Sequence, residues 1–143
     1  MNEEVGAAVI TSVTTMKYKL PSTWSVFTGE LYSILQALTY MQQTDYPKYV
    51  IITDSLSSIQ SIQKIYTHHP IVKLIKCELF RIQQRQKQVA IVWVPSHIGI
   101  SGNEKADQSA KEAAQQADAM TETRTTPSDL KVFIKNKVLD TWQ

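Results

Sequence analysis

The chain has 143 residues, a net charge of +2 and 43% hydrophobic residues, as expected of an ordinary globular protein. We expect residues 1–119 to form one domain, and residues 120–143 a Thr-rich linker with a C-terminal amphipathic helix. No apolar run approaches the roughly 20 residues of a membrane span, and a single cysteine excludes an internal disulfide. With an acidic start, MNEEVG, that does not resemble a secretory signal, we expect an intracellular protein, in the nucleus or cytoplasm, with no membrane partner.

The first elements expected along the chain are a β-hairpin and an amphipathic helix. Apolar residues over 6–13 and alternating ones over 14–20 predict two strands. Thr28 is the expected N-cap of a helix over 29–43, whose apolar residues recur at the spacing of one buried face. Glu30 lies in the expected first turn, where the helix dipole alone would favour a carboxylate.

The middle of the chain predicts a buried strand followed by a helix. The strand YVIIT, residues 49–53, ends on Asp54. Asp54 either caps the next helix or belongs to a site, because ligands of open α/β sheets bind at the carboxyl ends of strands. His68 and His69 then break the helix, and we expect them to be solvated rather than metal ligands.

A further helix is expected over residues 71–87. The residues expected to face inward are Ile71, Leu74, Ile75, Leu79 and Ile82. Basic residues off this stripe are Lys73, Lys76, Arg81, Arg85 and Lys87. A solvated face is the simpler interpretation of these charges, and a surface that follows phosphates is the alternative.

The most informative stretch is residues 89–114, VAIVWVPSHIGISGNEKADQSAKEAA. Its first six residues predict a strand buried on both faces, because they are β-branched or aromatic and a proline follows them. A loop with two glycines carries His97, and Ser101 and Glu104 have the spacing of a capping box that starts a helix. Asp107 lies in the opening turns of that helix.

Three carboxylates thus stand where a helix starts or a strand ends: Glu30, Asp54 and Asp107. Three like charges cannot share a site without a cation, and oxygen-only ligands favour Mg²⁺ or Mn²⁺ over zinc. Clusters that hold two such ions catalyse phosphodiester hydrolysis, and His97 on its loop can move a proton. A Ser96–His97 nucleophile is disfavoured, because adjacent residues rarely reach hydrogen-bond geometry and no orienting acid is evident.

Three blocks in this order, GELYSILQAL, VIITDS and VWVPSHIGISGNEKADQSAKEAA, resemble ribonuclease H. The last and most specific block is most similar to the ribonuclease H domain of insect-type non-LTR retrotransposons, and the tail SDLKVFIKNKVLDTWQ resembles the segment that follows it there. The resemblance implies an α/β fold with a mixed β-sheet flanked by helices, and a two-ion Mg²⁺ or Mn²⁺ site. It also implies cleavage of the RNA strand of an RNA–DNA hybrid, leaving a 5′-phosphate and a 3′-hydroxyl.

The resemblance also implies roles for individual residues. Positions that match the family's catalytic residues are Glu30, Asp54, His97 and Asp107, of which the three carboxylates match metal ligands. Ser55 and Asn103 match positions that lie near the substrate or brace the site in relatives. Apart from the resemblance, Lys73 and Lys76 would contact phosphates of a bound substrate.

One departure from the family pattern concerns its first strand. Family members begin with a strand that carries a TDGS-like segment, whose aspartate is a fourth metal ligand. That strand pairs between those expected at 6–13 and 49–53, and this sequence begins at about the point where the segment would end. We therefore expect the strand to be absent, which exposes two sheet edges and favours strand exchange between copies, a segment from elsewhere or a rearrangement. Glu3 and Glu4 would lie on a loop, which holds a ligand poorly.

Two other functions are left open by the sequence. The first is an inactive retroelement remnant of the same fold, which would bind nucleic acid in a salt-dependent way without cutting it. The second is an assembly protein, which would dimerise without affinity for nucleic acid. The preference for RNA over DNA is not predicted, because 2′-hydroxyl contacts in the family draw partly on the first strand.

Overall fold

The computed structural model describes residues 4–116, 120, 121, 129, 134 and 135. Its elements, in chain order, are β1 (Val5–Ile10), β2 (Thr15–Leu20), α1 (Val26–Gln42), β3 (Lys48–Thr53), α2 (Leu56–Gln63), α3 (Pro70–Gln84), β4 (Gln88–Trp93), α4 (Ser101–Gln115) and β5 (Met120–Thr121). The predicted C-terminal helix lies largely outside the described residues, and β5 occupies the start of the predicted linker. No helix in the described part is long and apolar enough to cross a membrane.

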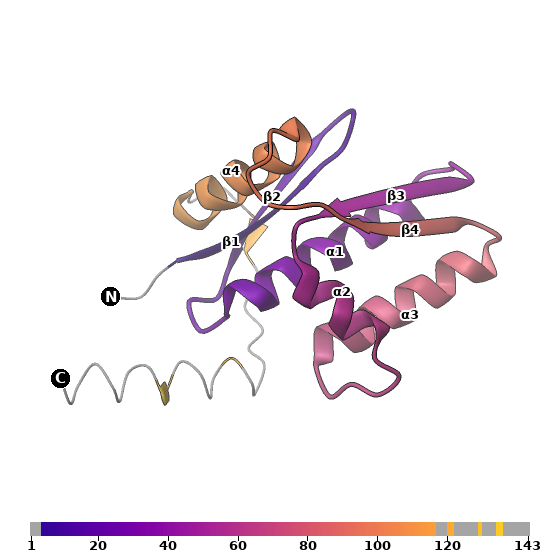
Figure 1. The fold of residues 1–143 in the computed structure, drawn as a ribbon, viewed down its shortest axis with the longest axis horizontal. Coiled ribbons are helices and arrows are strands. Elements are labelled where there is room, and N and C mark those ends of the chain that lie inside the picture. Colours follow the sequence, from indigo (N-terminus) through magenta and orange to yellow (C-terminus); the bar gives the residue numbers. More distant parts are fainter. Residues whose placement is uncertain (1–3, 117–119, 122–128, 130–133, 136–143) are drawn as a thin grey trace.

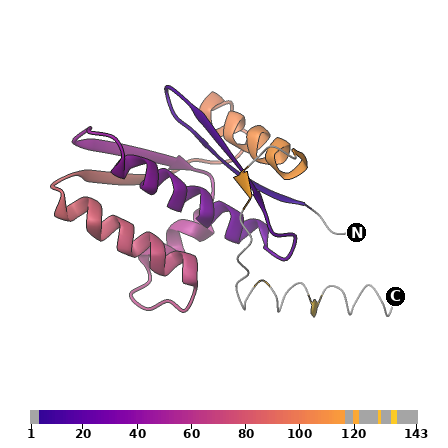
Figure 2. The same ribbon diagram turned by 180° about the vertical axis from the view of Figure 1, so that it is seen from behind.

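The strands form two sheets instead of one (Figures 1 and 2). β1 and β2 pair antiparallel, which confirms the predicted hairpin, and β5 runs parallel to β2. β3 and β4 pair parallel, from Lys48 opposite Gln88 to Thr53 opposite Trp93. Among the described strands none pairs with both β1 and β3, so each of these strands keeps one unpaired edge.

The prediction that the strand over 89–94 is buried on both faces is wrong. Ile91 packs against the core, whereas Val92 is 44% exposed; on β3, Ile51 is buried and Val50 is 62% exposed. The reason is that α1, α2 and α3 all lie toward the core, while α4 packs against β1 and β2 (Figure 1). One face of the β3–β4 sheet therefore remains open to solvent.

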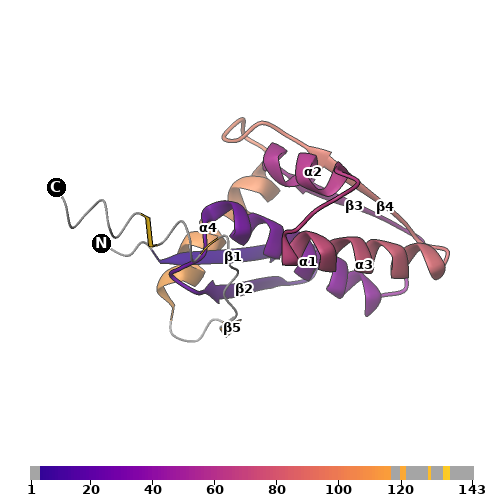
Figure 3. The ribbon, with the colours of Figure 1, turned by 90° about the horizontal axis from the view of Figure 1, so that it is seen from below.

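The core forms where α1 meets α3 and the strands. Leu31 and Leu38 on α1 are fully buried, and Val72 and Ile75 on α3 face them (Figure 3 shows the two helices side by side). Leu74, predicted to face inward, is instead 40% exposed. The buried stripe of α3 runs through residues 71, 72, 75 and 82, and Leu74 lies to one side of it.

The start of α1 differs from the prediction. Ser25 is the N-cap, and its Oγ accepts a hydrogen bond from the Thr28 N–H at 3.1 Å, so Thr28 lies within the first turn. Asp129 Oδ1 accepts three hydrogen bonds here: from Ser25 N–H at 3.0 Å, Ser25 Oγ at 3.1 Å and Thr28 Oγ1 at 2.7 Å. A buried carboxylate from the far end of the chain is thus stabilised by the N-terminus of α1.

His69 is a partly buried cap of α3 and not a solvated side chain, which corrects the prediction for this residue. Its Nδ1 accepts a hydrogen bond from the Ile71 N–H at 3.2 Å, and its Nε2 lies 3.4 Å from Thr28 Oγ1. The ring of Phe27 packs edge-on against it. Burial lowers the pKa of His69, although the Asp129 carboxylate opposes this shift.

We expect the domain to lose stability as the pH falls from 7.5 to about 5, and His69→Gln to reduce that loss. Because folding lowers the pKa of His69 below 6.5, the unfolded chain takes up the proton first. The contribution of neutral His69 to the free energy of unfolding is therefore fully present above pH 6.5, and it disappears as the pH falls through the folded-state pKa. Urea unfolding at both pH values measures it, with the exposed His68→Gln as the matched control. An unaltered pH dependence in His69→Gln would contradict this.

Gly6 allows α4 to lie directly on β1. A Cβ at this position would stand 2.0 Å from the carbonyl oxygen of Ala110 and 2.7 Å from the nitrogen of Ala114. Because both atoms belong to the helix backbone, Gly6→Ala should destabilise the domain by about 1–3 kcal/mol. Gly102→Ala is the control, since a Cβ there meets nothing within 4 Å, and it should change the unfolding free energy by less than about 0.5 kcal/mol. Equal effects in urea unfolding would rule out this packing.

Candidate active site

The backbone around Asp54 is fixed by both strands of the β3–β4 sheet. The Val94 N–H donates to the Thr53 carbonyl at 2.9 Å, just before Asp54. The indole N–H of Trp93 donates to the carbonyl of Asp54 at 3.2 Å. The carboxyl end of β3 therefore has a defined position, as the sequence predicted for a site at a strand end.

The side chain of Asp54 is oriented by two neutral donors. Its Oδ2 accepts from Ser96 Oγ at 3.0 Å and from Asn103 Nδ2 at 3.1 Å. Ser96 belongs to the loop over 94–100, and Asn103 lies at the start of α4. Within the described structure Oδ1 accepts no hydrogen bond, so one carboxylate oxygen is held in place while the other is available.

Glu30 is held by the N-cap of α2, Ser55, which is the residue after Asp54. Its Oε2 accepts from Ser55 Oγ at 2.5 Å, and Ser55 Oγ is 2.6 Å from Ser58 Oγ. Burial raises the pKa of Glu30, the Ser55 hydrogen bond opposes that shift, and the Asp54 charge adds to it. Because α1 begins at Val26, Glu30 lies beyond the first turn, where the helix dipole has little effect. The helix dipole therefore does not account for a carboxylate at this position, although the sequence allowed that explanation.

Asp107 is not brought to the other two carboxylates. Its Oδ2 forms an ion pair with Lys111 at 2.8 Å, one turn along α4, and its side chain is 42% exposed. In the described part of the chain there is no group of three or more His, Cys, Asp or Glu side chains that could hold a metal ion. The structure thus brings together Glu30 and Asp54 and leaves Asp107 apart from them.

His97 is exposed on the loop over 94–100, with a positive φ of 58°. In the described structure no hydrogen bond joins it to Glu30 or Asp54. The predicted capping box is wrong, because Ile100 is the N-cap of α4 and makes no side-chain cap bond. Glu104 instead accepts from the Gly99 N–H at 3.1 Å and so ties the loop to the helix.

Comparison with known families agrees with the sequence motifs. A family model for RNase H matches residues 2–115. The chain belongs to the RNase H family. Its fold is of the expected class, α/β with helices flanking the strands, although the strands lie in two sheets. RNase H proteins act on RNA–DNA hybrids and typically use divalent metal ions.

The residues of this RNase H domain fit a divalent ion in part. Glu30 and Asp54, linked through Ser55, supply carboxylate oxygens, the donor type that Mg²⁺ and Mn²⁺ prefer. Asp107 lies one helical turn after Asn103, and the amide of Asn103 bonds to Asp54. Asp107 is therefore roughly one helical turn from a residue that contacts Asp54 directly. Its pair with Lys111 is an exposed i,i+4 pair, worth less than about 1 kcal/mol, and exchanges easily for another cation.

The predicted substrate-binding residues of the RNase H domain have different surroundings. Ser55 is buried and bonds to Glu30, and Asn103 bonds to Asp54, so both brace the carboxylates. Lys73 is exposed on α3. Lys76 donates instead to the carbonyls of Lys64 and Ile65, which anchors the loop before α3.

Trp93 and Ser58 are parts of the site that the sequence did not predict. The sequence predicts Trp93 only as a strand residue, and Ser58 only as part of a helix. For Trp93 the sequence does hold a signal, an indole at the last position of a strand, because the indole N–H needs an acceptor nearby. For Ser58 the signal is its spacing from Ser55, which is that of an N-cap residue and the N3 residue of the same helix.

We expect Glu30→Gln to raise the thermal stability of the metal-free domain at pH 7. Folding raises the pKa of Glu30 above its ordinary 4.5. The folded state is therefore destabilised by the charged carboxylate once the pH rises through the folded-state pKa. Below pH 4.5 the carboxyl is protonated in both states, and the two proteins should then unfold at the same temperature. Thermal unfolding in EDTA at pH 7 and about pH 3.5 tests this. A variant that is less stable at pH 7 would contradict it.

Proposed function

We propose that this domain is a metal-dependent ribonuclease that hydrolyses the RNA strand of RNA–DNA hybrids. The observation that carries the proposal is that Glu30 bonds to Ser55, the residue after Asp54, at the carboxyl end of β3, with one Asp54 oxygen available. Two adjacent carboxylates repel each other unless a cation or a proton lies between them. Membership of the RNase H family supports the substrate class.

The residues of the candidate site have separate roles in this proposal. Glu30 and Asp54, joined by Asp107 when it exchanges Lys111 for a metal ion, would hold two ions, Mg²⁺ or Mn²⁺, which would supply an activated water and stabilise the leaving 3′ oxygen. Ser55 orients Glu30, while Asn103 and Ser96 orient Asp54. His97, exposed on its loop, moves a proton between the site and solvent.

We also propose that one further strand completes the sheet between β1 and β3. Both strands keep an unpaired edge among the described residues, and a single strand between them would join the two sheets. A second copy of the chain, or a segment from elsewhere, would supply it, and a segment with the family's TDGS-like pattern would add a further carboxylate ligand, as the resemblance implies. The same resemblance supports an origin of the domain in a retrotransposon.

A second candidate function is a binding module that holds the hybrid and does not cut it. The observation that favours it is the ion pair of Asp107 with Lys111, which leaves two carboxylates together instead of three. Binding would then rest on contacts with phosphates, and it would weaken steeply with added salt.

Cleavage of a labelled RNA–DNA hybrid in Mn²⁺ separates these functions. We expect the wild-type protein to cut the RNA strand, and Asp54→Asn to lower the rate at least about a hundredfold, because a neutral amide no longer attracts the ions. Asp45→Asn, an exposed aspartate in the loop before β3, is the matched control and should cut normally. Salt-dependent binding with no cleavage by the wild type would favour the binding module. Equal rates for wild type and Asp54→Asn would exclude this site.

A further inference from the structure

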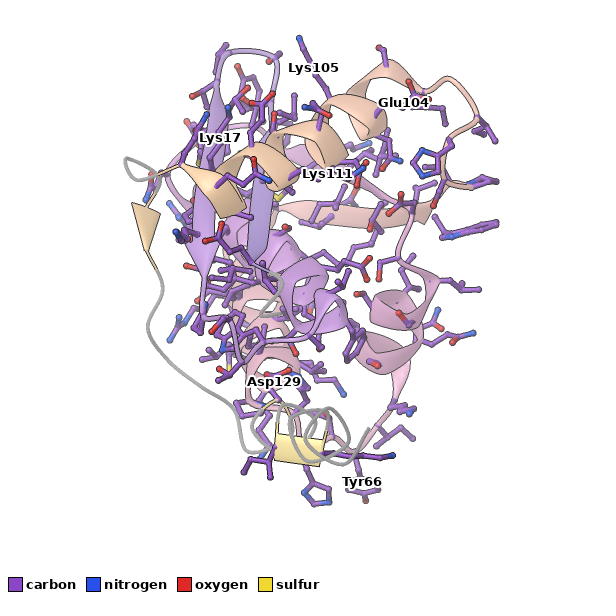
Figure 4. The ribbon with its side chains drawn as sticks, turned by 90° about the vertical axis from the view of Figure 1, so that its left-hand side faces the viewer. Lys17, Tyr66, Glu104, Lys105, Lys111 and Asp129 are labelled. Carbon is purple, nitrogen blue, oxygen red and sulfur yellow. The ribbon has the colours of Figure 1, made fainter. Side chains whose placement is uncertain are left out.

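One buried carboxylate, that of Asp129, lies outside both the candidate site and the part of the chain that matches RNase H, residues 2–115. It is 2% exposed, and its Oδ1 accepts three hydrogen bonds from Ser25 and Thr28 at the start of α1. Figure 4 shows Asp129 at the opposite end of the view from Glu104 and Lys105, which belong to α4. Asp129 therefore acts on α1 and not on α4.

The hydrogen bonds around Asp129 form a chain in which every donor has an acceptor. His69 Nδ1 accepts from the Ile71 N–H at 3.2 Å, so the proton of the neutral ring is on Nε2. Thr28 gives its single hydroxyl proton to Asp129 at 2.7 Å, which leaves its oxygen to accept from His69 Nε2 at 3.4 Å. The chain thus joins α3 to the first turn of α1 and ends on Asp129.

The first turn of α1 is held between this carboxylate and the candidate site. Thr28 and Glu30 point to opposite sides of the helix, because two residues turn it by about 200°. On the far side Glu30 bonds to Ser55, the N-cap of α2. Between them Gly29 packs on the hairpin, where a Cβ would stand 3.2 Å from a side-chain carbon of Leu20. A shift of this turn would therefore move Glu30.

The start of α1 depends on an anion from elsewhere in the chain. No acidic side chain lies in the first turn of α1, although the exposed N–H groups of a helix start favour a negative charge. Helix ends fray, and Glu30 comes directly after the first turn. Asp129 supplies the missing negative charge and limits the fraying before it reaches Glu30.

We propose that Asp129 is a positioning residue for Glu30. By holding the first turn of α1 through Ser25 and Thr28, it keeps the Glu30 carboxylate where a divalent ion would bind. Asp129 itself contacts neither the ion nor the substrate. This inference rests on the proposed function, and it extends the site to a residue beyond the part of the chain that matches the family.

Titration of the full chain with Mn²⁺, at about 15 °C where domains are usually most stable, tests this role. Thr28→Val removes the hydroxyl and keeps the charge of Asp129, and it should weaken Mn²⁺ binding about fivefold or more, because Glu30 loses its support. Asp129→Ala should weaken binding at least as much. Thr28→Ser keeps the hydroxyl and should bind like the wild type. Ile82→Val, a buried change near the end of α3, is the matched control and should leave the affinity unchanged.

Hydrogen exchange in EDTA gives a second measurement that needs no metal. Amides of residues 26–30 should exchange about tenfold faster in Thr28→Val and in Asp129→Ala, because the first turn then opens locally more often. Thr28→Ser and Ile82→Val should leave these amides unchanged. Exchange that is unchanged in Asp129→Ala would overturn the inference, because Asp129 would then not hold the turn.

The outcomes separate this inference from the proposed function. Wild-type Mn²⁺ affinity in Thr28→Val and Asp129→Ala, despite faster exchange, would give Asp129 a purely structural role and overturn the inference alone. An equal loss of affinity in Ile82→Val would also overturn it, because the loss would then follow stability. A wild type that does not bind Mn²⁺ would overturn the proposed metal site, and this inference with it.

Discussion

Glu30 and Asp54 carry like charges, and the fold brings them near each other at the carboxyl end of β3, because Glu30 bonds to Ser55, the residue after Asp54. The groups that position them are neutral: Ser55 for Glu30, and Ser96 with Asn103 for Asp54. Neutral donors orient a carboxylate but do not cancel its charge, so the pair retains an attraction for a cation. A purely structural pair of acids would more commonly be matched by lysine or arginine. This unmatched repulsion is the physical basis of the proposed metal site.

The same few hydrogen bonds connect the two separate sheets. Asp54 follows the β3–β4 sheet, whereas Asn103 lies on α4, which packs against β1 through the space left by Gly6. Glu30 comes from α1, whose start is fixed by the buried carboxylate of Asp129. The geometry of the site therefore depends on how the two sheets are held together. A strand between β1 and β3 would act on the spacing of the carboxylates as well as on stability.

The elements were largely predictable because their signals are local: β-branched runs for the strands, and helical periodicity for α1 and α3. Asp54 was found because a strand end is recognisable in sequence. The contact of Asp129 with Ser25 spans 104 residues and leaves no local signal. The exposure of Val50 is not predictable from the sequence either, since an apolar residue is buried only if another element covers it. The pairing of Asp107 with Lys111 has a local signal, the i,i+4 spacing, but the sequence does not decide between this pair and a metal site, because the same carboxylate suits a metal or an ammonium group.

Titration of the full chain with Mn²⁺ at pH 7, followed by the loss of the free-ion signal in electron paramagnetic resonance, tests the central claim directly. We predict that the wild type binds Mn²⁺, and that Glu30→Gln and Asp54→Asn each weaken that binding by about tenfold or more, because each removes one charged ligand. Asp45→Asn should bind like the wild type. Equal Mn²⁺ affinity in all four proteins would contradict the claim that Glu30 and Asp54 together form a cation site.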